Sequence, residues 1–358
     1  MATNIVGATG IDKVQDGIIV NADIDTVAAS KLTGALPAIS GASLTNIPAA
    51  NITGTLPAIS AANLTAIPAA NITGTLPAIS GANLTGISSQ GRNLFINGGF
   101  DVWQRGTSLV AATSYLADRW WNSTTETQTR QTFTVGQTDV PHNPTYYHRG
   151  SSGSTEWYGL KQCIEDVGIT AGREVTLSYW AKGSSAFTNA PFRGQNFGSG
   201  GSSEVNAALS TASITTSWAR YTHTFTWPSI SGKTVGAGSF IRINLIRAQV
   251  NNVTIDLANC QLEFGDTATD FEQRTYGEEL ALCQRYYEDF PGTIQGGADT
   301  TGINMYMHIP YKVTKRVTPT ITYGTLYQTI INSSVHGFGV RRSGGEAYIN
   351  DAKSDAEL

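Results

Sequence analysis

Apolar and polar side chains alternate over several segments in the middle of the chain. Residues 174–183 have the sequence EVTLSYWAKG, and the same period of two recurs at 219–227, 240–247 and 252–264. That period is typical of β-strands with one buried face. Gly, Ser and Asn dominate residues 184–203, where we predict a long loop that is functional or mobile. We therefore predict a β-sandwich over residues 92–274.

A helical pattern follows the sandwich, at residues 275–291. Thr275 and Glu278 match the T-x-x-E pattern of a capping box. The apolar residues that follow are spaced as in a heptad, and Pro291 and Gly292 predict the end of the helix. Two heptads are too few for an independent coiled coil. The helix therefore needs support, either from neighbouring helices or from its own sandwich.

Residues 292–358 alternate again and predict a distal β domain. The candidate strands are 303–311, 318–327 and 337–341. About 65 residues form a marginal domain alone, but they suffice as part of a trimeric tip. With the sandwich, this domain makes the chain all-β apart from one short helix.

A repeat of 20 residues fills positions 31–91, and its second copy has the sequence NITGTLPAISAANLTAIPAA. Gly and Pro would interrupt a helix in every copy, and a single copy has too few large apolar side chains for a core. Wrapping several chains around one axis, with Ile and Leu inward, solves both problems. We predict a trimeric shaft rather than a disordered linker, and we assign residues 1–30 to attachment.

Composition excludes several classes of function. Only 14% of the 358 residues are charged, and the net charge of −4 offers no basic excess for binding nucleic acid. No apolar run is long enough to span a membrane, and we see no signal peptide. The three cysteines, Cys163, Cys260 and Cys283, have no metal-binding spacing. We expect buried free thiols, with a Cys163–Cys260 bridge as the alternative.

Catalytic motifs are not found in the sequence. The five histidines are scattered, and no nucleophile-elbow, zinc-protease or phosphate-loop pattern occurs. The acids Glu165 and Asp166, and the group Asp266, Asp270 and Glu272, are more typical of a solvated surface than of a glycosidase pair. We therefore predict that the protein is not an enzyme.

Aromatic residues are more informative. All seven tryptophans lie between Trp103 and Trp227. Sugars have apolar faces and hydroxyl rims, so flat aromatic rings beside polar side chains suit them. We predict a glycan site on the central sandwich, made by Trp121, Trp157, Tyr158, Arg149, Arg193 and Asn196. The competing site is the distal domain, with Tyr306, His308, Tyr327, His336 and Arg341.

Two long motifs resemble the receptor-binding region of phage tail fibres: RNLFINGGFDVWQRGTS with YLADRWW, and QLEFGDTATDFEQRTYGEELALCQRYYE. The repeats and the final DAEL are similar to the same fibres. The central region also resembles jelly-roll carbohydrate-binding modules, through the opening 93–103, the strand 177–183 and the strand 255–263. Some such modules hold a structural calcium ion, for which the nearest matches are Asn97, Asp101 and Asp256. The resemblance implies no other cofactor.

This resemblance implies a homotrimeric virion protein, made in the host cytoplasm and attached to the tail or baseplate through residues 1–30. It would recognise a host cell-surface polysaccharide, of lipopolysaccharide or capsule type, and mediate adsorption. Nucleic acid and membrane insertion have no part in this function. Two alternatives stay open: a virion-bound glycan depolymerase and a purely structural connector.

Overall fold

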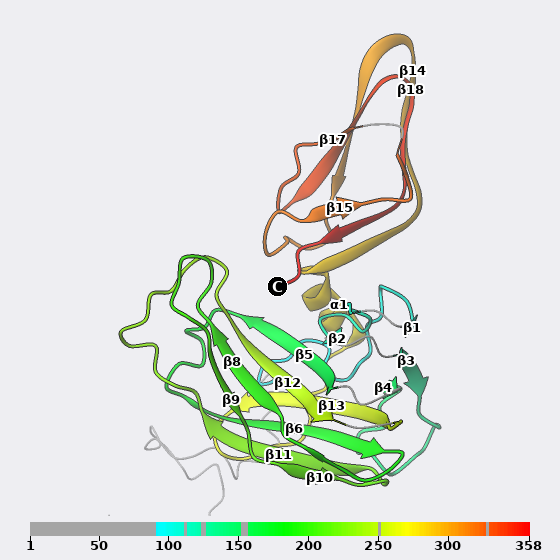
Figure 1. Cartoon of the computed structure of the whole chain (residues 1–358). Helices are drawn as coiled ribbons and strands as arrows, with labels where there is room; N and C mark the ends of the chain where they lie inside the picture. Colours follow the sequence, from blue (N-terminus) through cyan, green and yellow to red (C-terminus); the bar gives the residue numbers. More distant parts are fainter. Residues whose placement is uncertain (1–90, 111–112, 123–126, 152–156, 250–251, 327–328) are drawn as a thin grey trace, which may run out of the picture. The chain divides into compact units, whose positions relative to one another are not determined.

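The computed structural model describes residues 91–358, apart from 111–112, 123–126, 152–156, 250–251 and 327–328. The chain divides into two units, and these residues belong to the second, Ile79–Leu358. The predicted attachment segment 1–30 and all of the predicted shaft except Gly91 lie outside the described residues. Within them the expectation of an all-β chain is confirmed, because α1 is the one helix among eighteen strands (Figure 1).

Two antiparallel sheets form a jelly-roll β-sandwich (Figure 1). The six-stranded sheet has the order β1 (Ser108–Leu109), β3 (Thr127–Thr132), β4 (Tyr146–Ser151), β13 (Thr254–Phe264), β6 (Glu174–Gly183) and β11 (Ala219–Thr226). The five-stranded sheet has the order β2 (Trp121–Asn122), β5 (Trp157–Glu165), β12 (Phe240–Gln249), β8 (Phe192–Asn196) and β9 (Val205–Ala208). A separate pair joins β7 (Phe187–Asn189) to β10 (Ala212–Ile214).

The core of the sandwich follows from the alternation in the sequence. Val175 and Leu177 of β6 and Ile241 and Ile243 of β12 are fully buried and belong to one apolar cluster. Burying a side chain of this size contributes about 1.5–3 kcal/mol. Residues between them, such as Arg242, point to the opposite face, because successive side chains of a strand alternate. The core therefore fixes which side chains the sheets present outward.

The prediction of one long loop at 184–203 is wrong, since this segment contains β7 and β8. The strand β8 does not show an alternation of apolar and polar residues, because one of its inward-facing residues is polar. Gln195 is fully buried, and its Nε2 donates a hydrogen bond to the carbonyl oxygen of Pro228 at 3.0 Å. The hydrogen-bonded amide of Gln195 therefore occupies a core position where a period-two pattern would have an apolar side chain.

The helix α1 (Tyr276–Gln284) begins as expected and ends early. Thr275 caps it, because its Oγ1 accepts a hydrogen bond from the backbone N–H of Glu278 at 3.4 Å, and Glu278 Oε2 accepts one from the backbone N–H of Thr275 at 2.9 Å. The predicted heptad seam is wrong, because Tyr287 and Phe290 belong to strand β14 (Tyr287–Pro310), where they pair with Asp355 and Ala352. The helix lies against its own sandwich, since the Glu279 carboxylate accepts a hydrogen bond from the backbone N–H of Asn97.

The distal sheet is built on two long strands, β14 and β18 (Gly337–Asp355). The predicted strands 303–311 and 337–341 coincide with parts of them. Three short strands also pair with β18: β15 (Thr320–Thr322), β16 (Thr325–Leu326) and β17 (Thr329–Ile331). A second apolar cluster, centred on the fully buried Phe338 and Val340, stabilises this sheet.

Buried charges connect the end of β18 to the sandwich. Glu357 forms ion pairs with Arg119 and with Arg105, the latter at 3.2 Å. The guanidinium of Arg119 is buried and lies 3.4 Å from the centre of the Tyr286 ring. Such an arrangement is stable only while both charges keep their partners.

The cysteine prediction is confirmed. Cys163, Cys260 and Cys283 are all buried free thiols, and no Cys163–Cys260 bridge forms. In the part of the chain described, the helix is too short and polar to cross a membrane.

Candidate functional site

The outer face of the five-stranded sheet carries a line of side chains suited to ligand binding. Because Ile241 and Ile243 face the core, Arg242 and Asn244 of β12 face outward. The register of the sheet pairs Asn244 with Lys161 of β5 and with Phe192 of β8, and it pairs Lys161 with Trp121 of β2. These four residues, Trp121, Lys161, Asn244 and Phe192, form one line across four strands, which we call the aromatic row.

The aromatic row has a ring at each end and polar groups between the rings. Three strand spacings of about 4.8 Å separate Trp121 from Phe192, so the row is about 14 Å long. Lys161 Nζ lies 5.7 Å from the centre of the Trp121 ring, and burial lowers the pKa of this lysine. Asn244 Oδ1 is buried, and no described residue donates a hydrogen bond to it.

A polar cluster lies beside the aromatic row on the same face. Arg242 Nη2 contacts Glu204 Oε1 at 2.6 Å and Asn206 Oδ1 at 3.1 Å, while Asn196 Nδ2 donates to Glu204 Oε2 at 3.2 Å. Gly194 makes room for this cluster, because a Cβ there would lie 2.5 Å from Asn206 Oδ1. We call Arg242, Glu204, Asn206 and Asn196 the polar cluster.

The structure brings two of the six predicted glycan-binding residues to this face. Trp121 begins the aromatic row, and Asn196 belongs to the polar cluster. Trp157 and Tyr158 open β5 and pair with Gln249 and Ala248 of β12. Their backbone is therefore part of the same sheet.

The two predicted arginines lie elsewhere. Arg193 pairs with the buried Ile243, and its guanidinium lies 5.5 Å from the centre of the Trp227 ring. Arg149 belongs to β4 of the other sheet, where its Nε contacts Asp256 Oδ1 at 2.7 Å. Neither arginine is on the face that carries the aromatic row.

The sequence contains a signal for two of the residues that the prediction missed. Arg242 and Asn244 alternate with the apolar positions of 240–247, so their outward direction follows from the pattern. The sequence does not show that Lys161 and Phe192 lie beside Asn244, because this depends on how β5 and β8 pair with β12. Glu204 and Asn206 lie on β9 or just before it, a strand that the sequence analysis does not predict.

Two of the three residues considered for calcium have protein partners in the structure. Asn97 uses its side chain to fix a turn, with its Nδ2 donating to the carbonyl oxygens of Val102 and Asp118 at 2.8 and 3.0 Å. Asp256 is paired with Arg149 and lies 3.7 Å from Lys182 Nζ. Calcium needs six to eight oxygen ligands. Among the described residues, no three His, Cys, Asp or Glu side chains gather as metal ligands.

Three of the competing distal residues lie on β14 and β18, and His336 directly precedes β18. Tyr306 and Arg341 are exposed and directly opposite each other in the register, and His308 and His336 are also exposed. Tyr327 lies outside the described residues. The distal alternative stays open on these observations.

No protein-family model matches this sequence, and no curated protein matches it. Solved structures do match part of the chain. The xylan-binding domain CBM22-2 of Paenibacillus barcinonensis Xyn10C is 15% identical, with a TM-score of 0.30, and the match covers 41% of this chain and 92% of that one. The cellulose-binding domain of Cellulomonas fimi β-1,4-glucanase C is 20% identical, with a TM-score of 0.25 and coverages of 35% and 83%.

The enzymatically active domain of bacteriophage CBA120 tailspike protein 4 is 13% identical, with a TM-score of 0.30. That match covers 49% of this chain and 22% of the tailspike chain. At these identities and TM-scores, the likenesses carry no conclusion about what this chain binds.

Proposed function

We propose that this chain recognises a host cell-surface glycan, of lipopolysaccharide or capsule type, as the receptor-binding protein of a phage tail fibre. The aromatic row is the observation that carries the proposal. Trp121 and Phe192 present rings for the apolar faces of sugar rings, and Lys161 and Asn244 lie between them for the hydroxyl groups. The half-buried side chain of Asn244 offers its amide N–H groups beside Lys161 for the hydroxyl groups of a glycan.

The polar cluster extends this surface for a chain of several sugars. Asn196 and Asn206 supply amide groups beside the row, and their ion-paired neighbours Arg242 and Glu204 keep them in place. A site on the strands of a sheet is more precise than one on loops. The surface is therefore suited to a polysaccharide that runs across β5, β12 and β8.

The proposed role is binding without cleavage. Glycoside hydrolysis uses two carboxyl groups, one of which must be protonated or free to attack. Two carboxylates on this face, Glu204 and Glu165, each face an arginine at 2.6 and 3.0 Å. Charge pairing of this kind supports a binding role over the depolymerase alternative.

A glycan array probed with the full chain tests the proposal. We expect binding to a surface polysaccharide, a loss of at least tenfold in affinity for Trp121→Ala and for Asn244→Ala, and no release of new reducing ends. Tyr323→Ala is the matched control, because this exposed tyrosine lies between β15 and β16 of the distal domain. Full binding in both row variants, at unchanged melting temperatures, would contradict the aromatic row and favour the distal residues.

The virion role has its own experiment. We propose a homotrimer, made in the host cytoplasm and attached to the tail or baseplate through residues 1–30. A chain that lacks these residues should still bind host cells but should be missing from assembled particles. A purely structural connector would bind no cells in either form, and this result would overturn the receptor role.

A further inference from the structure

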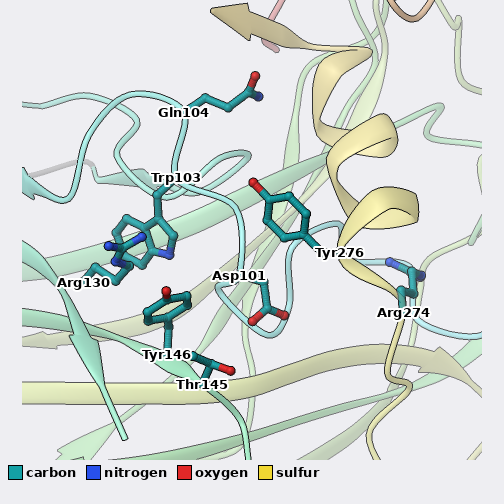
Figure 2. Close-up of a pocket in the computed structure, with 8 residues that line it drawn as sticks. All are labelled: Asp101, Trp103, Gln104, Arg130, Thr145, Tyr146, Arg274 and Tyr276. Atoms are coloured by element: carbon teal, nitrogen blue, oxygen red, sulfur yellow. The ribbon is translucent and has the colours of Figure 1, made fainter.

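A pocket opens on the sandwich away from the aromatic row, with a volume of about 560 Å³. Figure 2 shows side chains from three parts of the chain around it: the turn before β1, the strands β3 and β4, and the start of α1. The volume lies within the range of about 300–1,000 Å³ that small-molecule sites have. The sequence analysis did not identify this pocket.

Aromatic rings line much of the pocket. Trp103 comes from the segment before β1, Tyr146 is the first residue of β4, and Tyr276 is the first residue of α1 (Figure 2). Tyr276 is 59% exposed although it is a large aromatic residue. An exposed ring beside a pocket provides a surface for the apolar face of a ligand.

Two opposite charges in the pocket have no oppositely charged partner among the described residues. The guanidinium of Arg130 lies 4.3 Å from the centre of the Tyr146 ring and contacts no described carboxylate. The carboxylate of Asp101 accepts no hydrogen bond from a described residue. Arg274, by contrast, contacts Glu279 and Glu272 at 3.4 and 3.5 Å. Arg130 and Asp101 are therefore the groups that a ligand can engage.

The turn that presents Asp101 is held rigidly. Asn97 and Phe100 adopt positive φ angles of 59° and 58°, a conformation that is unfavourable for a non-glycine residue and persists only where its surroundings fix it. The Asn97 side chain bonds the backbone of Val102 in both directions, and the Phe100 ring is fully buried. Gly99 leaves space for the carboxylate, since a Cβ there would lie 2.7 Å from Asp101 Oδ2.

We propose that this pocket binds a single acidic sugar residue. The carboxylate of the sugar would pair with Arg130, two of its hydroxyl groups would donate to Asp101, and its ring would pack on Tyr276. This ligand matches both charges, whereas a neutral sugar would leave Arg130 without a partner. The inference rests on the proposed function only in taking the ligand to be a sugar, since the pocket and the aromatic row are separate surfaces.

Titration of the full chain with D-glucuronic acid and with D-glucose, followed by saturation-transfer NMR and calorimetry, tests the proposal. We expect glucuronic acid to bind better than glucose. Arg130→Gln should weaken glucuronic acid at least tenfold and leave glucose unchanged. Asp101→Asn should weaken both sugars. Tyr276→Ala should also weaken the binding of both sugars. Tyr276 is exposed, so this variant should fold normally.

Arg173→Gln is the matched control, because Arg173 also lies over an aromatic ring, Phe264, at 3.4 Å. Equal affinity of the Arg130 and Arg173 variants for glucuronic acid would overturn the proposal, as would an absence of binding by the unmodified chain. The Trp121→Ala variant separates the two sites. It should lose polysaccharide binding and keep glucuronic acid binding, so either site can fail without the other.

Discussion

Asp101 lines the proposed sugar pocket, and its charged form destabilises the folded state because it is largely buried. Burial, with a smaller contribution from the nearby Glu279, raises the pKa of Asp101 to about 6 from an ordinary value near 3.8. Between these values the folded state binds a proton that the unfolded state has already lost. Stability therefore falls as the pH rises from about 4 to 6, and the cost of the buried charge is present in full above pH 6.

We predict that Asp101→Asn raises the melting temperature at pH 8 and leaves it unchanged at pH 4. The amide has nearly the same shape and carries no charge to desolvate. Thermal unfolding of both proteins at the two pH values measures this difference. Asp139→Asn, at an exposed acid, provides the control. A stabilisation of equal size at pH 4 and pH 8 would show that the charge of Asp101 is not its cause.

Glu357 is predicted to be one of the most sensitive single positions in the described chain. Glu357→Gln would leave the buried guanidinium of Arg119 without its anion, although the hydrogen bond from Arg119 to the carbonyl oxygen of Cys163 would persist. Removing one partner of a buried pair costs about 3–5 kcal/mol. Urea unfolding should reveal this loss, while Lys353→Gln, on the exposed side of β18, should change little. Similar unfolding free energies for the two variants would disprove the pairing.

At the scale of elements, strands β8 and β9 hold the polar cluster in place. We predict that Gly194→Ala reduces glycan affinity about tenfold, or about 1.4 kcal/mol. The added Cβ would lie 2.5 Å from Asn206 Oδ1 and 2.8 Å from Glu204 Oε1, so both side chains must move. The backbone at Gly194 has no positive φ, so alanine is tolerated there and β8 still pairs with β12.

Glycan binding and thermal melting of the same Gly194→Ala preparation decide this prediction. Gly172→Ala is a control of the opposite kind. Gly172 has a positive φ of 68°, and no atom lies within 4 Å of the position that a Cβ would take. The Gly172→Ala variant should therefore lose stability but keep its affinity for the glycan. A Gly194→Ala protein that binds normally would mean that the polar cluster has no part in recognition.

Strands with strict alternation, and the start of α1 with its capping box, could be predicted from the sequence. The observed bounds of β6 are the predicted ones. The observed bounds of β11 and β12 differ from the predicted bounds by one and two residues, in each case at the C-terminal end. β8 was missed because its inward residue Gln195 is polar and finds its partner, Pro228, only in the folded chain. The end of α1 was missed because pairing with β18 outweighs the heptad spacing beyond Gln284.

The candidate sites were only partly predictable for a related reason. The sequence indicates that Trp121 and Asn196 suit a sugar, and that Arg242 faces away from the core. It does not contain the register that brings Lys161 and Phe192 into one row. The sequence does not show the pocket, because Asp101 and Arg130 come together through the pairing of β1 with β3, and Tyr276 joins them only through the packing of α1 on the sandwich.

At the scale of the whole molecule, the repeat at 31–91 predicts a trimer with its Ile and Leu side chains on the axis. We expect Ile59→Asp to lower the melting temperature of the trimer far more than Asn63→Asp. The first change would place three unpaired carboxylates near one axis, each costing several kcal/mol to desolvate, whereas the second would add charge to a solvated face. Analytical ultracentrifugation should give three times the 38.0 kDa mass of the chain, with the Ile59 variant dissociating first. A 38.0 kDa species at micromolar concentration, or equal melting of the two variants, would remove the basis for an apolar axis.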